Sequence, residues 1–443
     1  MFSLGGLSAA VQQNSTPYQR PKLLITEVQI AQLQGFHVRL LTDQGLYGDG
    51  ECVDAASGAE GIIRGMRLVR QSPLNVQAIW ESIRTSSIFG GAQGGQFTTA
   101  LTAVEIALWD LAGKALNIPI YQLMGGKVRE RTRIYMDMGV DDPKDPAFPA
   151  EMQKLKDLGF TMAKIDIDDG GDPARTDRVN WTANNAEISH MIDKARYIRE
   201  ALPKDFDLAI DMHGRYDVGT GKRVAKEMEP FKLVWLEEPV PPDNIDAMAD
   251  IRHSTSTPIC CGENIYMRWG FRELFEKHAV DIIMPDIQKC GGLMEGKKIA
   301  DLAATYFVPI APHSQASPVG AMATAHAMST VPNFLATEWH WGHPNNRTIA
   351  WNNFVTEGNI IQNGFITPPD KGGIGVTINE DYWKKQQGAR WFTTLETGGR
   401  GGGFPGVGPG GRGAGGNAPA GAPAGAPVAA PAGTPAGGRG RGQ

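Results

Sequence analysis

The sequence DLAIDMH at residues 207–213 is followed by LVWLEEP at 233–239 and PICCGE at 258–263. Each run is apolar and β-forming, carries a polar or acidic side chain at or near its end, and precedes a stretch with helical spacing. Five other runs share this form: RIYMDM (133–138), MAKIDID (162–168), DIIMPDI (281–287), VPIAPH (308–313) and FLATEW (334–339). Eight strand–helix units in a row predict an α/β fold, namely a modified TIM-type (β/α)8 barrel.

The polar residues that end these runs recur at a nearly constant interval. Successive members of the set Asp211, Glu237, Glu263, Asp286, His313 and Glu338 are 23 to 27 residues apart. One strand, one helix and two short loops need about 25 residues, so each side chain is expected at the carboxyl end of its strand. That end of a barrel carries the active site. The longer interval from Lys164 to Asp211 predicts a loop at 169–185 over the barrel mouth.

The residues before the barrel predict a smaller domain. Residues 23–42 alternate apolar and polar side chains, which is typical of antiparallel strands. Residues 98–116 place apolar side chains at three- to four-residue spacing, which indicates a helix. We therefore expect an α+β capping domain at 23–126 and a barrel domain at 127–397, whose last part returns to the cap.

Both ends of the chain differ in composition from the rest. Residues 398–443 are mostly Gly, Ala and Pro and contain no acid, so they cannot bury enough apolar surface to become ordered. We expect a disordered tail there. Residues 1–22 start with a short apolar run that no basic residue precedes. Two interpretations stay open: a truncated export signal of a periplasmic protein, or an N-terminal extension of a cytoplasmic one.

The composition excludes several classes of protein. Of the 443 residues, 41% are hydrophobic and 21% are charged, and the formal net charge is −5. Because there is no apolar run of about 18 residues, no membrane-spanning helix is expected. The absence of a basic stripe argues against a nucleic-acid partner. The four cysteines form no CxxC pair, which argues against a disulfide scaffold and a zinc site. We expect an enzyme that forms a homo-oligomer.

Asp211, Glu237 and Glu263 end three consecutive predicted strands. Neighbouring strands lie about 4.8 Å apart, so the three carboxylates are expected to converge. Without a counter-ion they would repel one another and raise one another's pKa values. Carboxylates and water are ligands that suit Mg²⁺. The sequence therefore predicts Mg²⁺ as the cofactor, and the alternative is that each acid pairs with a basic side chain.

Several motifs together resemble the enolase superfamily, and most closely its mandelate racemase and muconate lactonizing enzyme-like group, within which the galactonate-type acid-sugar dehydratases are most similar. The motifs are LWDLAGKALNIPIYQLMGG (108–126), AIDMHGR (209–215), WLEEP (235–239), CGE (261–263), PDIQKCGG (285–292) and APH (311–313). The resemblance covers about residues 23–390. It implies that the three carboxylates hold Mg²⁺, which binds a substrate carboxylate while the neighbouring carbon loses a proton.

The resemblance also implies roles for individual residues. His313 matches the general base and Asp286 the acid that orients it, whereas a lone structural histidine is the alternative. Glu338 matches a glutamate that donates a hydrogen bond to the substrate carboxylate; it must then be protonated, which a nearby anion would favour. A salt-bridged Glu338 is the alternative. His213, two residues after Asp211 and so on the same face of the strand, matches the general acid that protonates the departing 3-hydroxyl group.

Lys164 stands at the first position of the Lys-x-Lys motif of racemases, and Asp166 stands at the second. A racemase needs bases on both faces of the reacting carbon, whereas dehydration needs one base and one acid, so the missing lysine favours a dehydratase. Lys164 is expected to stabilise the developing charge or bind the substrate carboxylate, with an ion pair to Asp166 as the alternative. Arg215 is expected to contact the substrate, with a solvent-exposed salt bridge as the alternative.

The predicted activity is that of a carbon–oxygen lyase, which eliminates water from a sugar acid to give a 2-keto-3-deoxy acid. A galactonate-like aldonate is the first candidate substrate. Two alternatives stay open: an epimerase or racemase that uses His313 and Lys164, and a non-catalytic sugar-acid-binding protein. Two further motifs are expected beside the pocket, the cap loop Gly90–Gly95 and the Trp339–Trp341 segment (WHW), for which simple packing is the alternative.

Overall fold

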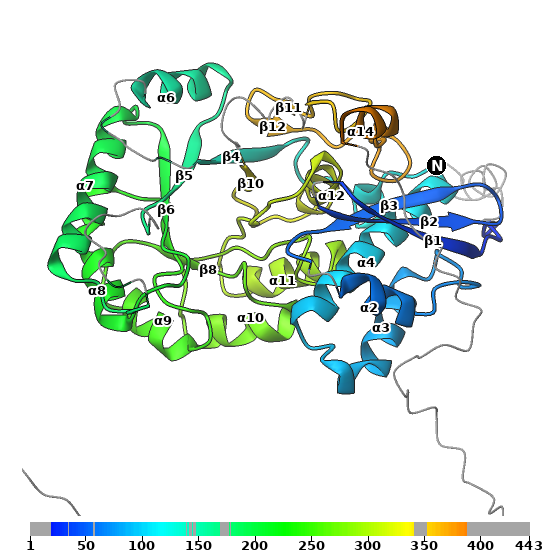
Figure 1. Ribbon diagram of the computed structural model, residues 1–443, viewed down its shortest axis with the longest axis horizontal. Coiled ribbons are helices and arrows are strands. Elements are labelled where there is room, and N and C mark those ends of the chain that lie inside the picture. Colours follow the sequence, from blue (N-terminus) through cyan, green and yellow to red (C-terminus); the bar gives the residue numbers. More distant parts are fainter. Residues whose placement is uncertain are drawn as a thin grey trace, which may run out of the picture. The chain divides into compact units, whose positions relative to one another are not determined.

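The computed structural model describes residues 19–33, 35–55, 58–138, 140, 144, 148–168, 177, 179–340 and 352–387. All of them lie in one unit of the fold (Figure 1). Most of the N-terminal segment 1–22 and the whole tail 398–443 lie outside the described residues. Within the described part of the chain, no helix is long and apolar enough to cross a membrane.

The N-terminal part is a three-stranded antiparallel sheet with helices packed against it. Its elements are β1 (Ile25–Gln32), β2 (Phe36–Thr42), β3 (Tyr47–Cys52), α2 (Ala59–Gly65), α3 (Val76–Ser86), the 3-10 helix η1 (Ile88–Gly90), α4 (Gly95–Leu116) and α5 (Ile120–Leu123). Helix α4 packs closely on β3, since a Cβ atom on Gly50 would lie 2.2 Å from the Ala103 carbonyl oxygen. The strands and the long helix expected from the sequence pattern are confirmed.

The second part is the barrel. Its strands are β4 (Thr132–Met138), β5 (Met162–Asp166), β6 (Asp207–Asp211), β7 (Trp235–Glu237), β8 (Ile259–Cys261), β9 (Ile282–Ile283) and β10 (Thr337–His340). Strands β4 to β9 pair in chain order in parallel, and β10 pairs with β4. Isolated bridges link Ile283 to Ile310 and Ile310 to Phe334. Ile310 therefore takes the place of the seventh strand, and the eight apolar runs close the predicted barrel.

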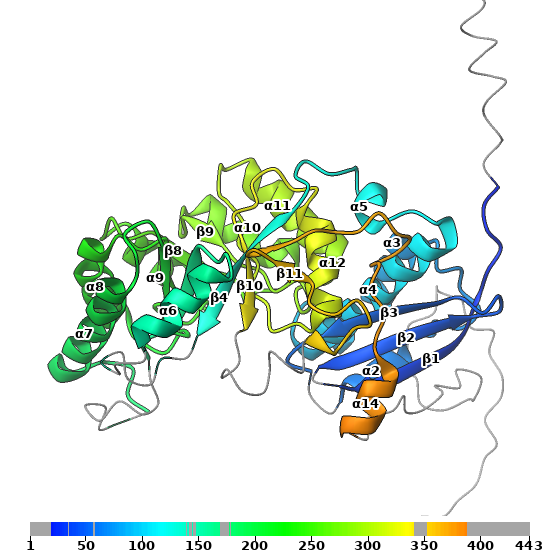
Figure 2. The same ribbon diagram turned by 90° about the horizontal axis from the view of Figure 1, so that it is seen from above.

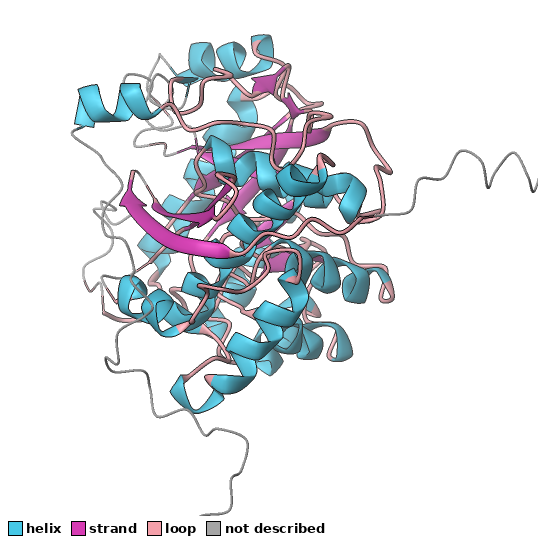
Figure 3. Ribbon diagram, turned by 90° about the vertical axis from the view of Figure 1, so that its right-hand side faces the viewer, coloured by secondary structure: helices cyan, strands magenta, loops and turns pink. Residues whose placement is uncertain are grey.

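Helices lie on the outside of the strands (Figures 2 and 3). They are α6 (Phe148–Asp157), α7 (Asn185–Ala201), α8 (Val218–Glu227), η2 (Glu229–Phe231), α9 (Ile245–Arg252), α10 (Met267–Glu276), α11 (Leu293–Ala304) and α12 (Pro318–Met328). Strand residues alternate between two apolar clusters, as the period of two requires. Ile134 and Met136 of β4 join the cluster between strands and helices, whereas Tyr135 joins Trp235 in the cluster that fills the barrel.

Residues 352–387 run back from the barrel to the cap. Strands β11 (Ile361–Gln362) and β12 (Phe365–Ile366) form a hairpin that pairs with β4, and α14 (Glu380–Gln387) follows. Glu380 forms a 2.5 Å ion pair with Arg39 of β2. The Asp110 carboxylate of α4 accepts a 2.8 Å hydrogen bond from the Ile374 N–H group. These contacts attach the returning segment to both β2 and α4.

Candidate active site

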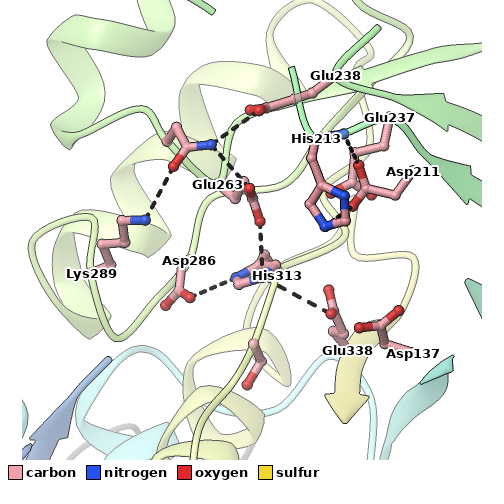
Figure 4. Close-up of polar contacts among 12 residues, drawn as sticks. Asp137, Asp211, His213, Glu237, Glu238, Glu263, Asp286, Lys289, His313 and Glu338 are labelled. Carbon is pink, nitrogen blue, oxygen red and sulfur yellow. Dashed lines mark hydrogen bonds and ion pairs between the residues drawn. The ribbon is translucent and has the colours of Figure 1, made fainter. Parts of the chain in front are cut away.

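The polar residues of constant spacing gather at the carboxyl ends of the barrel strands (Figure 4). They are Asp211 and Glu237 at the ends of β6 and β7, Glu263 after β8, Asp286 after β9, His313 after the Ile310 bridge, and Glu338 within β10. The parallel register produces this arrangement, because it places Asp211 directly opposite Glu237. The six residues predicted to form the site therefore lie together in the structure.

Lys164 of β5 is a buried cation among these acids. Its Nζ atom lies 3.1 Å from Asp211 Oδ2, 3.1 Å from Glu237 Oε1 and 3.3 Å from Glu338 Oε2. Burial opposes the charge on Lys164, but the three carboxylates hold its pKa well above the ordinary range. Lys164 thus shares its charge among three acids, in place of the simple ion pair with Asp166 that was the alternative expectation.

His313 and Asp286 form the expected pair. His313 Nδ1 lies 2.7 Å from Asp286 Oδ2, and Asp286 Oδ1 accepts a 2.8 Å hydrogen bond from the Gln288 N–H group. The other ring nitrogen, Nε2, lies 2.9 Å from Glu263 Oε2. Burial opposes a charged imidazole, but Glu338 and Glu263 raise the pKa of His313 well above its ordinary value. The buried Asp286 fixes the ring, so that Nε2 faces the site.

Glu338 is fully buried between two cations. The Tyr135 hydroxyl group donates a 2.8 Å hydrogen bond to Glu338 Oε2. Burial would raise the pKa of Glu338, but Lys164 and His313 lower it well below the ordinary range. The cations that face Glu338 therefore favour its ionised form here, whereas the expected donor of a hydrogen bond to the substrate carboxylate must be protonated, and that role stays a prediction.

His213 forms a second His–Asp pair, whose acid the sequence did not reveal. His213 Nδ1 lies 2.8 Å from Asp168 Oδ1, and Nε2 lies 3.7 Å from Asp211 Oδ2. His213 lies beyond the end of β6 with a φ of 48°, so a turn brings its ring beside Asp211, and the expected strand alternation does not. Burial opposes the charged ring, but Asp168 and Asp211 raise the pKa of His213 to about 10.

Arg215 supports this second pair. Its Nε atom lies 2.8 Å from Asp168 Oδ2, and its side chain is half exposed while that of Asp168 is buried. The structure thus places Arg215 in a salt bridge, which was the alternative to substrate contact. Because Arg215 and His213 bind the two oxygens of one carboxylate, Arg215 helps to hold Asp168 against the imidazole ring.

The donor set at the ends of β6 to β8 suits Mg²⁺ by its chemistry, since all three residues offer hard carboxylate oxygens. Trp235 Nε1 donates to Glu237 Oε2 at 3.1 Å, and Asn264 Nδ2 donates to Glu263 Oε1 at 3.0 Å. The remaining oxygens turn onto Lys164 and His313. Lys164 and His313 therefore compensate the negative charge of Glu237 and Glu263 in this structure. A divalent cation bound to the acids would compensate the same charge.

Among the described residues, two other groups of three side chains have ligand atoms that all lie within 4.8 Å of one another, close enough to hold a metal ion. They are Asp166, Asp211 and His213, and also His313, Glu338 and His340. Asp211, Glu237 and Glu263 do not converge on one point in this structure. The contacts of Lys164 and His313 explain this, because each draws a carboxylate toward itself.

Two further residues close the site beside Glu338. His340 Nε2 lies 3.1 Å from Asp137 Oδ2 of β4 and 3.1 Å from Glu338 Oε1. The ring of His340 lies 6.4 Å from that of His313. Alternation within TEWH places His340 on the same face of β10 as Glu338, so the sequence did contain this signal. Trp339 instead packs in the outer cluster, and Trp341 lies outside the described residues.

A polar chain connects the site to the cap. Asn264 Nδ2 donates to both Glu263 and Glu238 at 3.0 Å, and its Oδ1 accepts from Lys289 Nζ at 3.2 Å. Lys289 Nζ also lies 2.9 Å from Asp54 Oδ2, after β3 of the cap. Only the doubled glutamate of LVWLEEP hinted at Glu238 in the sequence. Lys289 lies in the PDIQKCGG motif, but the sequence assigns no role to it or to Asn264, because Asp54 and Glu238, which they contact, come from distant segments.

The two expected loops differ in how much of them is described. In the cap loop Gly90–Gly95, a Cβ atom on Gly94 would lie 3.3 Å from the Tyr266 ring, so the loop borders the barrel. Its placement over a substrate stays a prediction. Of the loop expected at 169–185, residues 169–176 and 178 lie outside the described residues.

Two family models match the chain. Residues 8–125 match the N-terminal domain of the mandelate racemase / muconate lactonizing enzyme family, and residues 147–382 match the enolase C-terminal domain-like family. The first match covers the cap sheet and its helices, and the second covers most of the barrel and the segment that returns to the cap.

Known proteins show the same relationship. D-xylonate dehydratase of Haloferax volcanii is 38% identical over 365 residues, which are 81% of this chain and 87% of that protein. D-galactonate dehydratase of Pectobacterium atrosepticum is 29% identical over 350 residues, 78% of this chain and 88% of that protein. The crystal structure of a mandelate racemase/muconate lactonizing enzyme-like protein from Rubrobacter xylanophilus is 38% identical, has a TM-score of 0.77, and covers 84% of this chain and 99% of its own. The chain therefore belongs to the enolase superfamily, in its mandelate racemase and muconate lactonizing enzyme group.

Proposed function

We propose that this protein is a Mg²⁺-dependent sugar-acid dehydratase, which removes water from C2 and C3 of an aldonate. The observation that carries this proposal is the presence of two separate His–Asp pairs at one acid-lined site. A dehydration needs one group that removes the C2 proton and one that protonates the departing 3-hydroxyl. His313 with Asp286 and His213 with Asp168 supply these two groups.

His313 is the base in this proposal. Asp286 holds the hydrogen on Nδ1, so Nε2, once it has released its own proton, offers the lone pair that accepts the C2 proton. The contact of Nε2 with Glu263 shows that the nitrogen reaches the space beside the acids. His213 is the acid. Its Nε2 atom carries a proton to the 3-hydroxyl oxygen, which leaves as water, and the resulting enol becomes the 2-keto-3-deoxy acid.

Negative charge develops on the substrate carboxylate when the C2 proton leaves. Lys164 is the buried ammonium group that stabilises this charge, and Glu338 lies beside it at 3.3 Å. Asp211, Glu237 and Glu263 would hold Mg²⁺, which when bound supplies further positive charge next to that carboxylate. Burial of Lys164, His313, Asp211 and Glu237 excludes water, so their charges act at a low effective dielectric constant.

The relatives narrow the substrate class. The two curated relatives act on D-xylonate and D-galactonate according to their names. These aldonates share their configurations at C2 and C3, the two carbons that react. Galactonate was the first candidate from the sequence, and the higher identity to the xylonate enzyme makes a five-carbon aldonate an equally direct one. We propose both as the first compounds to test.

The test is a panel of aldonates and aldarates incubated with the protein and Mg²⁺, followed by quantification of 2-keto acids and of epimers. A dehydratase releases keto acid from at least one aldonate. An epimerase instead produces a C2 epimer without keto acid, and a binding protein shifts its melting temperature on ligand addition without any product. The engagement of Lys164 with three carboxylates argues against its use as a second base, which the epimerase reading requires.

A further inference from the structure

Three polar atoms, one of Glu338 itself and two of its neighbours, are buried but lack hydrogen-bond partners among the described residues. They are Asp137 Oδ1, Glu338 Oε1 and His340 Nε2. His340 Nε2 lies 3.1 Å from Asp137 Oδ2 on one side and 3.1 Å from Glu338 Oε1 on the other, and its single hydrogen can serve only one acceptor at a time, so Asp137 Oδ1 is left without a donor in any case. Buried polar groups without partners are costly, so such a cluster indicates that a ligand completes it.

The charges around the cluster define what the ligand is. A cation is disfavoured, because the Lys164 ammonium group already lies 3.3 Å from Glu338 Oε2 and His313 Nε2 lies 4.0 Å from Glu338 Oε1. A carboxylate is disfavoured, because Asp137 is itself an acid that faces the space. A neutral group that both donates and accepts fits both neighbours, and a hydroxyl group is such a group.

The hydrogen on His340 follows from its neighbours. The two atoms nearest to Nε2 are carboxylate oxygens, which can only accept when ionised, so Nε2 carries a hydrogen. A hydroxyl oxygen can accept this hydrogen and donate its own hydrogen to Asp137 Oδ1. Asp137 comes from β4 and His340 from β10, which pair with each other, with Asp137 directly opposite His340.

We propose that Asp137 and His340 form a subsite that binds one hydroxyl group of the sugar-acid chain and thereby selects the substrate. The subsite rests on the proposed function, since it presupposes a polyhydroxy acid in the site. An analogue that lacks the hydroxyl group leaves Asp137 and His340 buried without a partner. The expected discrimination is about 10- to 100-fold.

The experiment measures dissociation constants by calorimetry in the presence of Mg²⁺. The His313→Asn background is used, because it lacks the proposed base and holds substrates without turnover. The ligands are D-xylonate, D-galactonate and their single-deoxy analogues. The analogue that lacks the hydroxyl group of the subsite is expected to bind about 10- to 100-fold more weakly than the parent aldonate. Asp137→Ala is expected to make the dissociation constants of the two ligands equal. Asp137→Asn keeps an acceptor oxygen and is expected to retain part of the difference.

Asp207→Ala is the matched control, because Asp207 is at the amino end of β6, where it pairs with Arg133 at 2.7 Å. Asp207→Ala is expected to leave the ratio of the dissociation constants of each deoxy analogue and its parent aldonate unchanged. If Asp137→Ala weakens all ligands by the same factor, the subsite is overturned and Asp137 has a structural role. Should Asp137→Ala fail to fold, His340→Ala is judged by the same ratio. Keto-acid release by the wild-type protein tests the proposed function separately.

Discussion

The two His–Asp pairs at the barrel mouth have similar geometry but different surroundings. The Nδ1–carboxylate distances are 2.7 Å for His313 and 2.8 Å for His213. The side chain of His313 is only 6% exposed, whereas that of His213 is 34% exposed. The carboxylate of Asp286 accepts a hydrogen bond from the Gln288 N–H group. The carboxylate of Asp168 also pairs with Arg215, and the chain after Asp168 lies outside the described residues.

This difference fits two different tasks. A base that removes a proton from carbon must be held at a fixed distance in a dry environment, which burial provides for His313. An acid that releases water benefits from access to solvent, which the partly exposed His213 has. The positive φ of His213 puts its ring at the site by a turn, so its position depends on neighbours more than that of His313 does. The following predictions test this division of labour.

Removal of the divalent cation has the largest expected effect, because in the proposed reaction both pairs act on a substrate that the cation helps to hold. Exhaustive chelation should abolish keto-acid release and exchange of the C2 hydrogen with deuterated solvent. Glu237→Gln should weaken Mg²⁺ binding at least 10-fold by calorimetry. Glu229→Gln, on the outer face of the barrel, serves as the control. Full turnover after chelation and dialysis would contradict the metal assignment.

Replacement of the histidines separates the two roles. His313→Asn should reduce both keto-acid release and C2 hydrogen exchange about 10²- to 10⁴-fold, since the base is lost. His213→Asn should reduce keto-acid release by a similar factor but retain exchange, because the C2 proton can still leave. Mass spectrometry of deuterium in recovered substrate measures the exchange after long incubation. Wild-type keto-acid output from His213→Asn would assign the proton for the departing hydroxyl to another group.

The acids that hold the histidines give a finer test. Asp286→Asn should slow exchange and product release together, roughly 10- to 100-fold, because His313 loses its orientation. Asp168→Asn should slow product release alone by a similar or smaller factor. The rates of both processes are measured in the same samples. If both variants slow exchange equally, the pairs share one task and the division proposed here is wrong.

Stability against pH tests a group outside both pairs. Glu51 of β3 is fully buried, accepts a 2.7 Å hydrogen bond from the Ser317 N–H group, and burial raises its pKa to about 7. Folding favours the protonated form of the Glu51 carboxyl group. Its contribution to the free energy of unfolding is therefore complete below about pH 4.5 and is lost as the pH rises through about 7. The loss is at most about 3 kcal/mol. Glu51→Gln should flatten the fall in melting temperature over this range.

The smallest effect is expected from the C-terminal tail. Deletion of residues 398–443 should leave the melting temperature and the turnover number nearly unchanged, because this segment has no core-forming pattern and no residue of either pair. Differential scanning calorimetry and the keto-acid assay measure both quantities. A loss of several degrees would show that the tail packs against the rest of the chain.

Local pattern and spacing were sufficient to predict the barrel and its acids. Eight apolar runs specify eight strands because period and length are local properties of the chain. The constant interval of 23 to 27 residues then places Asp211, Glu237, Glu263, Asp286, His313 and Glu338 at one end, since parallel strands share their direction. The Asp286–His313 pair follows from the same rule, as these two residues end neighbouring strands.

Contacts between side chains from different units were decided only by the tertiary structure. The three acids around Lys164, the Arg215–Asp168–His213 arrangement and the Asp137–His340 pair all depend on angles at strand ends and turns. The ionisation of Glu338 depends on which charges face it, and the sequence could not rank Lys164 and His313 above a neighbouring anion. Spacing along a chain determines which strand end a residue occupies, whereas hydrogen bonding and charge depend on distances of a few ångströms that only the folded barrel sets.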